Sequence, residues 1–268
     1  MNLHTLVSDL IGNSLASIEV FVPEIVLCAV MVLLLLARLI KWTERIDAFY
    51  IALIGTIAAF YTTGFWQLLD PADPIGSKAK ELMAEGTPGG MFTGMLVYDG
   101  FTVFMRAILL GFAVLFVILT RLSGIPDKED GPDIYTLLLG STLGMCLMAS
   151  ANHLMMIFLA VEMASVPSYA LAGMLKGRRT SSEAALKYSV YGAGAAGVML
   201  YGISLIAGIA NSVHLPTMAQ QLAVRLPEMM ESTPEEVMVL ALGGLMVGVG
   251  LAFKLSAVPF HFWCPDVF

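Results

Sequence analysis

The feature that most constrains this chain is a series of long apolar segments separated by polar ones. The segments cover roughly residues 19–40, 46–69, 98–121, 133–150, 152–175, 183–210 and 236–259. Most are close to the ~20 residues that an α-helix needs to cross a hydrocarbon core about 30 Å thick. Only 13% of the residues are charged, against about 25% in soluble domains. The pattern predicts an all-α, polytopic bundle of about seven transmembrane helices.

The segments between these helices predict how the chain is organised across the membrane. Loops rich in Lys and Arg face the cytoplasm, and these residues concentrate after the first, third and fifth apolar segments. We therefore expect a multi-pass protein of the cell inner (plasma) membrane, with the N-terminus outside and those three loops in the cytoplasm. Residues 1–18 are expected at the interface. Residues 70–96, on the outward side, and 211–235 are expected to form extended polar loops.

We expect two parts, residues 1–130 with the first three helices and residues 131–268 with the remaining four. Neither part shows the sequence pattern of a cofactor, metal or nucleic-acid site. The three cysteines and four histidines lack the spacing of a disulfide framework or a metal site. The sequence also has no glycine-rich phosphate loop and no basic patch for nucleic acid. We therefore expect this chain to bind no cofactor, no metal and no nucleic acid.

The ionisable residues inside the apolar segments are the candidates for function, because a charge at that depth costs at least ~2.5 kcal/mol on insertion scales. Glu162 lies about ten residues, or ~15 Å, into the fifth segment. Ser165 and Tyr169 follow on the same helix face. We interpret Glu162 as a proton-relay carboxylate. The alternative is a protonated acid that only hydrogen-bonds a neighbouring helix.

Lys254 lies near the end of the last apolar segment, where two prolines predict that the helix breaks at about Pro259. Burial disfavours an ammonium and a nearby carboxylate favours it, so a neighbouring charge would control whether Lys254 holds its proton. We interpret it as the partner of Glu162. The alternative is a lysine that extends to the interface. His261, just past the break, is either a proton carrier or a structural group.

Three further charged residues lie in or beside the apolar segments. Lys187 follows Glu183 by four residues, which suits either a surface ion pair or a place on the proton path. Arg106 has no obvious partner in the sequence, and we expect it to form a structural pair. Glu24 begins the first segment, where a carboxylate favours a helix N-terminus. We expect that structural role rather than a place on a proton path.

Three stretches of the chain resemble subunit N of the proton-pumping NADH–quinone oxidoreductase, respiratory complex I. The first is Leu-Ala-Phe-Lys-Leu-Ser-Ala-Val-Pro-Phe-His-Phe-Trp-Cys-Pro-Asp-Val-Phe at 251–268. The second is Ser-Glu-Ala-Ala-Leu-Lys-Tyr at 182–188, followed by a Gly/Ala-rich run at 192–197. The third is Phe-Leu-Ala-Val-Glu-Met-Ala-Ser-Val-Pro-Ser-Tyr at 158–169. Cys264 departs from the pattern, since the family usually has a small polar residue there.

The resemblance implies an antiporter-like subunit of about fourteen helices, with two inverted five-helix repeats that each contain a broken helix. Because the chain stops at Phe268, inside the first broken helix, we expect it to be the N-terminal part of such a subunit. The resemblance implies that Glu162, Lys254, Lys187 and His261 carry out proton translocation. It implies partners among the other membrane-arm subunits of complex I and in the lipid bilayer.

The function expected from this resemblance is proton translocation coupled to electron transfer from NADH to quinone. The chain would act as a subunit of the enzyme and would perform no redox chemistry itself, since NADH and quinone are used by the complex. One alternative is a subunit of a multisubunit cation/proton antiporter, whose members share the Glu and Lys arrangement. The other is a non-pumping, truncated scaffold subunit.

Overall fold

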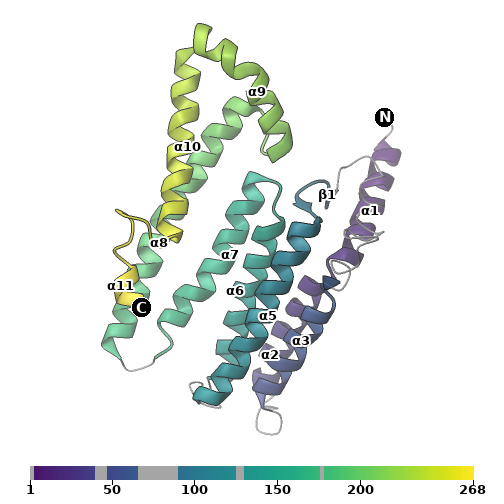
Figure 1. Ribbon diagram of the computed structural model, residues 1–268, viewed down its shortest axis with the longest axis vertical. Coiled ribbons are helices and arrows are strands. Elements are labelled where there is room, and N and C mark those ends of the chain that lie inside the picture. The colour runs from purple at the N-terminus through teal and green to yellow at the C-terminus, as the bar shows by residue number, and fades with distance from the viewer. Residues whose placement is uncertain (1–2, 40–46, 66–89, 125–129, 176–177) are drawn as a thin grey trace. The chain divides into compact units, whose positions relative to one another are not determined.

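The computed structural model describes residues 3–39, 47–65, 90–124, 130–175 and 178–268. These residues are helical almost throughout (Figure 1), which confirms the all-α prediction. Six helices are long and apolar enough to cross a membrane. They are α2 (Val22–Leu39), α5 (Gly100–Ser123), α6 (Gly131–Ser150), α7 (Leu154–Ala172), α8 (Arg179–Ala210) and α10 (Pro234–Lys254). The shorter apolar helix α3 (Ala48–Tyr61) corresponds to the second predicted span, whose end falls beyond the described residues.

The chain forms two compact units, Met1–Ala151 and Asn152–Phe268. The division predicted at residue 130 separates the first three helices from the expected antiporter-like repeat. It is a different kind of division from these compact units, and it stays a prediction. In the first unit, α2 packs against α3 and α6, and α5 packs against the same two helices. Its core consists of fully buried aliphatic side chains such as Leu27, Leu34, Leu110 and Leu139. The four helices pack pairwise because each buries one apolar face.

Local sequence explains where the helices of the first unit begin and end. Asp99 precedes α5 and its side chain accepts a 2.7 Å hydrogen bond from the Thr102 amide, which caps the helix. At the other end Gly124 adopts φ 66°, a left-handed conformation that glycine reaches without a steric penalty. Asp47 caps α3 in the same way as Asp99, through the Phe49 amide. These caps therefore set the helix boundaries on either side of the apolar stretches.

A short hairpin and an N-terminal helix complete the first unit. Strands β1 (Gly90–Met91) and β2 (Leu96–Val97) pair antiparallel at the end of the predicted 70–96 loop and one residue beyond it. The rest of that loop, residues 70–89, lies outside the described residues. The hairpin forms because Gly94, with φ 86°, permits the tight turn between the strands. Helix α1 (Leu3–Val20) contacts it through two side chains. Asn13 and Ser17 accept hydrogen bonds from the amides of the turn residues.

In the second unit, α8 packs against both α7 and α10. The α8–α10 contact is close because glycines face each other across it. A methyl group added to Gly202 would lie 2.7 Å from the Gly243 carbonyl oxygen, and one added to Gly243 would lie 3.0 Å from the Gly202 oxygen. Small residues allow the two backbones to approach closely. The resulting van der Waals contacts hold the helices together, because in lipid there is no hydrophobic driving force between them.

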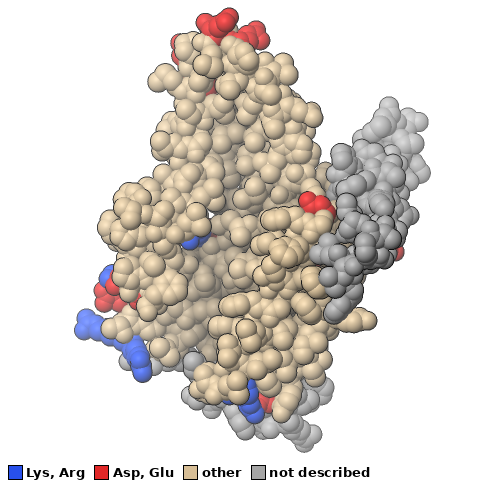
Figure 2. All heavy atoms as spheres, viewed as in Figure 1, with Lys and Arg blue, Asp and Glu red and all other residues tan. Residues whose placement is uncertain are grey.

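Helix α9 (Leu215–Ser232) occupies most of the predicted polar loop 211–235, so that prediction was wrong. Its prolines do not prevent a helix here. Pro216 lies in the first turn, where the missing amide hydrogen is not needed, and Pro227 lies within the helix. On the face shown in Figure 2, acidic side chains gather over the turn between α9 and α10. Glu231 and Glu235 are exposed at this turn.

The last apolar helix is broken at its C-terminal end, as predicted, but earlier than expected. Helix α10 ends at Lys254, five residues before Pro259. Ser256 follows in the left-handed region with φ 53°, which no continuing helix allows for such a residue. Helical structure resumes at α11 (Cys264–Val267). Lys254 is therefore the final residue of α10 rather than a residue within the helix.

Candidate functional site

The second unit brings Glu162 and Lys254 together, as the sequence indicated. Lys254 Nζ lies 3.1 Å from Glu162 Oε1, and the two side chains are 17% and 21% exposed. Glu162 projects from the middle of α7, and Lys254 from the last turn of α10. Burial of this degree removes most of the water that would screen the pair. The arrangement is a largely desolvated acid–base couple.

Two further side chains of α7 complete the surroundings of the Lys254 ammonium. Lys254 Nζ donates hydrogen bonds to Ser165 Oγ at 2.5 Å and to Tyr169 Oη at 2.9 Å. Glu162 Oε1 faces the same ammonium as an ion-pair partner at 3.1 Å. Ser165 donates its own hydroxyl hydrogen to the Val161 carbonyl, so its lone pairs are free to face Lys254. Three oxygen-bearing side chains of α7, Glu162, Ser165 and Tyr169, therefore surround Lys254 Nζ.

The spacing of the three acceptors follows from helix geometry. Glu162, Ser165 and Tyr169 are three and four residues apart, so they lie on one face of α7. The α7 helix contains Pro167, which cannot donate to the carbonyl of Met163 four residues earlier. The polar face was visible in the sequence. The hydrogen bonds from Lys254 to Ser165 and Tyr169 were not visible there, because they depend on how α7 and α10 are placed in the unit.

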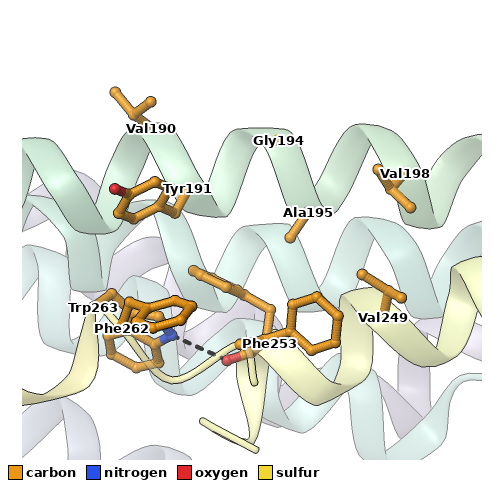
Figure 3. Close-up of a pocket in the computed structure, with 10 residues that line it drawn as sticks. Val190, Tyr191, Gly194, Ala195, Val198, Val249, Phe253, Phe262 and Trp263 are labelled. Atoms are coloured by element: carbon orange, nitrogen blue, oxygen red, sulfur yellow. Dashed lines mark hydrogen bonds between the residues drawn. The ribbon is translucent and has the colours of Figure 1, made fainter. Parts of the chain in front are cut away.

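Aromatic side chains enclose one side of this couple. The Tyr169 ring meets the Tyr188 ring edge to face at 4.5 Å between centroids. Tyr188 in turn stacks on Trp263 at 4.1 Å with nearly parallel planes. Trp263 Nε1 donates a 3.2 Å hydrogen bond to the carbonyl of Phe253, the residue before Lys254 (Figure 3). The Tyr188 and Trp263 rings were not predicted as part of the site, because aromatic residues in an apolar sequence carry no distinctive signal.

Lys187 forms the predicted ion pair with Glu183 at 2.8 Å and a second one with Asp266 at 2.9 Å. Its side chain is 37% exposed. The structure therefore places Lys187 in an ion-pair cluster that joins α8 to α11, rather than in contact with Lys254. A role in proton transfer stays a prediction.

His261 is held between the end of α10 and α11. Its ring packs on Phe262 with 5.2 Å between centroids. Its Nδ1 atom is buried, and none of the residues that the structure describes forms a hydrogen bond with it. The geometry does not bring His261 into contact with the Glu162–Lys254 couple, and its role as a proton carrier also stays a prediction.

The first unit contains a second buried couple, between Arg106 of α5 and Glu24 of α2. Arg106 Nε lies 2.6 Å from Glu24 Oε1, and each side chain is 1% exposed. The structural pairing expected for Arg106 is confirmed, whereas Glu24 does more than face its helix N-terminus. Arg106 also lies over the Tyr98 ring, 5.9 Å from its centroid. The sequence indicated that both residues are unusual, because each is a charged residue in or beside an apolar segment. It did not indicate that they pair with each other.

An apolar cavity of about 270 Å³ lies between α8 and α10, next to Trp263 (Figure 3). Its lining includes Tyr191, Val198, Val249 and Phe260. Neither Glu162 nor Lys254 lines it. Within the described ranges, no three His, Cys, Asp or Glu side chains lie close enough together to hold a metal ion.

Comparison with known proteins shows what this chain is similar to. The family profile described as "NADH:quinone oxidoreductase/Mrp antiporter, TM" matches residues 151–268, which include all four predicted site residues. The chain is similar to NADH-quinone oxidoreductase subunit N 2 of Sorangium cellulosum, with 36% identity over 96% of the chain and 48% of the relative. For the protein of that name from Symbiobacterium thermophilum, the identity is 34% over 97% and 49%.

Solved structures give the same result. A chain of respiratory complex I from Thermus thermophilus matches with a TM-score of 0.63 and 29% identity, over 92% of this chain and 47% of that one. A chain of the membrane-bound sulfane sulfur reductase, an archaeal respiratory membrane complex, matches with a TM-score of 0.69 and 18% identity, over 95% and 47%, and shows the fold alone. The chain spans about half the length of the curated relatives it matches.

Proposed function

We propose that the chain is an antiporter-like membrane subunit of NADH–quinone oxidoreductase, the complex for which its relatives are named, and that it translocates protons there. Proton movement is coupled to electron transfer from NADH to quinone, which other subunits carry out. This chain performs no redox chemistry and binds no cofactor. The observation that supports the proposal best is the contact between Glu162 and Lys254 inside a membrane-spanning unit.

The couple responds to charge because its two members depend on each other. At 3.1 Å and an effective dielectric constant of about 20, opposite unit charges attract by roughly 5 kcal/mol. Neutralising or withdrawing the Glu162 carboxylate therefore removes much of what holds a proton on Lys254. A positive charge arriving from a neighbouring subunit acts in the same direction. Lys254 then releases its proton and regains it when the carboxylate returns.

Lys187 and His261 are the candidates for carrying the proton onward. Lys187 is adjacent in sequence to Tyr188, whose ring contacts Tyr169 beside the couple. The polar imidazole of His261 lies seven residues beyond Lys254, and its buried Nδ1 is open to a hydrogen bond that none of the described residues provides. Both residues therefore flank the couple without being bound to it.

The surroundings proposed for the chain are the lipid bilayer and the other membrane-arm subunits of the complex. Large apolar side chains such as Leu122, Phe112 and Leu245 are more than half exposed on the spanning helices, which suits hydrocarbon. The Lys and Arg distribution supports an inner-membrane orientation with the N-terminus outside. The connections after α2, α5 and α7 then face the cytoplasm.

The proposal is tested by replacing Lys254 with Ala in the full-length subunit. The intact complex is reconstituted into vesicles, and protons moved per electron are measured with NADH as donor. We expect Lys254→Ala to lower this ratio. Arg178→Ala is the control, because it also removes a cation from the second unit, but an exposed one that precedes α8 and lies outside the couple. An unchanged ratio in Lys254→Ala would rule the proposal out.

The matched family profile also covers antiporters, which supports a second candidate function, cation/proton exchange. In that case vesicles containing the protein and its native partners would exchange cations for protons without NADH. A scaffold role would instead leave pumping intact after the couple is removed. The vesicle assay described above distinguishes the three outcomes.

A further inference from the structure

We propose that Tyr169 is a positioning residue for the Lys254 ammonium, and that the stacked rings of Tyr188 and Trp263 set the place of its hydroxyl group. The segment after the helix break would thereby control how firmly Lys254 holds its proton. This inference rests on the proposed function and adds a regulatory connection to the same site. Three sets of contacts hold the Tyr169 hydroxyl beside Lys254 and connect it to Trp263.

The first contact is the hydroxyl group itself. Tyr169 Oη accepts a 2.9 Å hydrogen bond from Lys254 Nζ. A hydrogen bond to a charged group stabilises that charge more than a bond between neutral groups does. Ser165 Oγ accepts from a second N–H, and Glu162 Oε1 lies 3.1 Å away as the ion-pair partner, so Tyr169 supplies one of the two hydrogen bonds described for the ammonium. Any displacement of the hydroxyl therefore leaves one N–H of a largely buried ammonium without a partner.

The second contact fixes the hydroxyl from behind. Gly192 of α8 faces Tyr169 so closely that a methyl group added there would overlap the Tyr169 hydroxyl oxygen. The same methyl group would lie 2.6 Å from Cζ of the ring. Glycine at this position makes the space that the tyrosine fills. The position of α8 therefore determines where Oη lies.

The third contact runs from Tyr169 to the segment after the break. Tyr188 meets Tyr169 edge to face and stacks on Trp263, with 7° between the latter two ring planes. Trp263 is only 5% exposed. Its Nε1 hydrogen bond to the Phe253 carbonyl ties the indole to the last turn of α10 (Figure 3). Residues 255–263 are thus held at both ends to groups that contact Lys254.

A shift of the segment after the break would move Trp263, then Tyr188, and then the Tyr169 hydroxyl. The titratable groups that face Lys254 are Glu162 and Tyr169 from α7 and Tyr188 from α8. Tyr188 Oη is itself within 3.3 Å of Ser168 Oγ, which keeps its hydroxyl turned toward α7. The break therefore acts on Lys254 through packed rings rather than through a further charge.

The first test uses Tyr169→Phe in the full-length subunit within the intact complex. The variant keeps the ring and removes only the hydroxyl acceptor. Protons moved per electron are measured across a range of pH in vesicles. We expect the alkaline fall of this ratio to move by about one unit toward lower pH, since one hydrogen bond to a charge is lost. Tyr191→Phe is the control that should not move the profile, because Tyr191 is exposed and lies three residues after Tyr188 on α8.

The second test uses Trp263, which touches Lys254 only through other residues. Trp263→Leu removes the stack and should shift the profile in the same direction as Tyr169→Phe, whereas Trp263→Phe should largely restore it. The double variant Tyr169→Phe/Trp263→Leu should shift no further than Tyr169→Phe alone, because the indole acts through the missing hydroxyl. Additive shifts would overturn the connection through the rings.

The two proposals fail in different ways. If Lys254→Ala lowers pumping while Tyr169→Phe leaves the pH profile unchanged, the positioning role of Tyr169 is wrong and the proposed function stands. If Lys254→Ala also has no effect, the proposed function itself is wrong.

Discussion

Glu162 Oε1 and Lys254 Nζ lie 3.1 Å apart, although they come from α7 and α10, which are separated in sequence by two other helices, α8 and α9. The contact places an acid and a base together where the surrounding residues are apolar. Ser165 Oγ and Tyr169 Oη accept hydrogen bonds from the Lys254 ammonium. The charge state of each partner therefore depends on the other, which is the physical basis of the proton-transfer account.

The buried pair of the first unit predicts an asymmetric effect on stability. Arg106→Leu leaves the Glu24 carboxylate buried without its partner, which is expected to cost about 3–5 kcal/mol. Replacing both residues by leucine should recover most of this loss, because no unpaired charge remains. Thermal unfolding of the full-length protein in detergent measures both. A double variant that is less stable than Arg106→Leu would contradict this explanation.

The glycine contact between α8 and α10 predicts a difference between two identical substitutions. Gly202→Ala forces the new methyl group against the Gly243 carbonyl oxygen, and we expect it to destabilise the protein by about 1–3 kcal/mol. Gly208→Ala lies in the same helix with open space around it. It should be neutral or stabilising by up to about 1 kcal/mol. Equal effects of the two variants on the unfolding midpoint would show that helix propensity alone governs them.

His153, at the start of α7, forms an isolated antiparallel bridge with His214, and this contact predicts a pH effect. Burial, and to a lesser extent the neighbouring His214, lowers the pKa of His153 below its ordinary value. The unfolded chain then binds a proton more readily than the folded one, so this contact loses stability as pH falls below about 6.5. Acidification should lower the protection factor of the Leu215 amide, its exchange rate compared with the intrinsic rate at the same pH, because this amide bonds the Asn152 carbonyl. His153→Gln should remove that dependence, and persistence of it in the variant would contradict the assignment.

Much of the fold could be predicted because membrane helices are encoded in apolar length. The six spanning helices coincide with predicted segments to within a few residues at most ends. Helix α9 was missed because its segment is polar and contains prolines, although Pro216 occupies a first turn that tolerates it. The end of α10 was placed too late for a related reason. Pro259 marked the break, but the backbone turns already at Ser256.

The candidate site was partly predictable for the same kind of reason. Charges in apolar segments identified Glu162 and Lys254, and helical spacing put Ser165 and Tyr169 on the face of Glu162. The connection from Tyr169 to Trp263 lies in ring packing between three segments, which no local pattern reveals. Glu24 was read from its place at a helix start, whereas its burial against Arg106 depends on how α2 and α5 pack in the unit.

The proton-to-electron ratio in vesicles tests the central claim most directly, with Glu162→Gln, Lys254→Met and the double variant compared in the intact complex. Residues that act as one couple have non-additive effects. Each single variant should lower the ratio, and the double variant should lower it no further than the more severe single one. A double variant that pumps as many protons per electron as the unaltered complex would contradict the account.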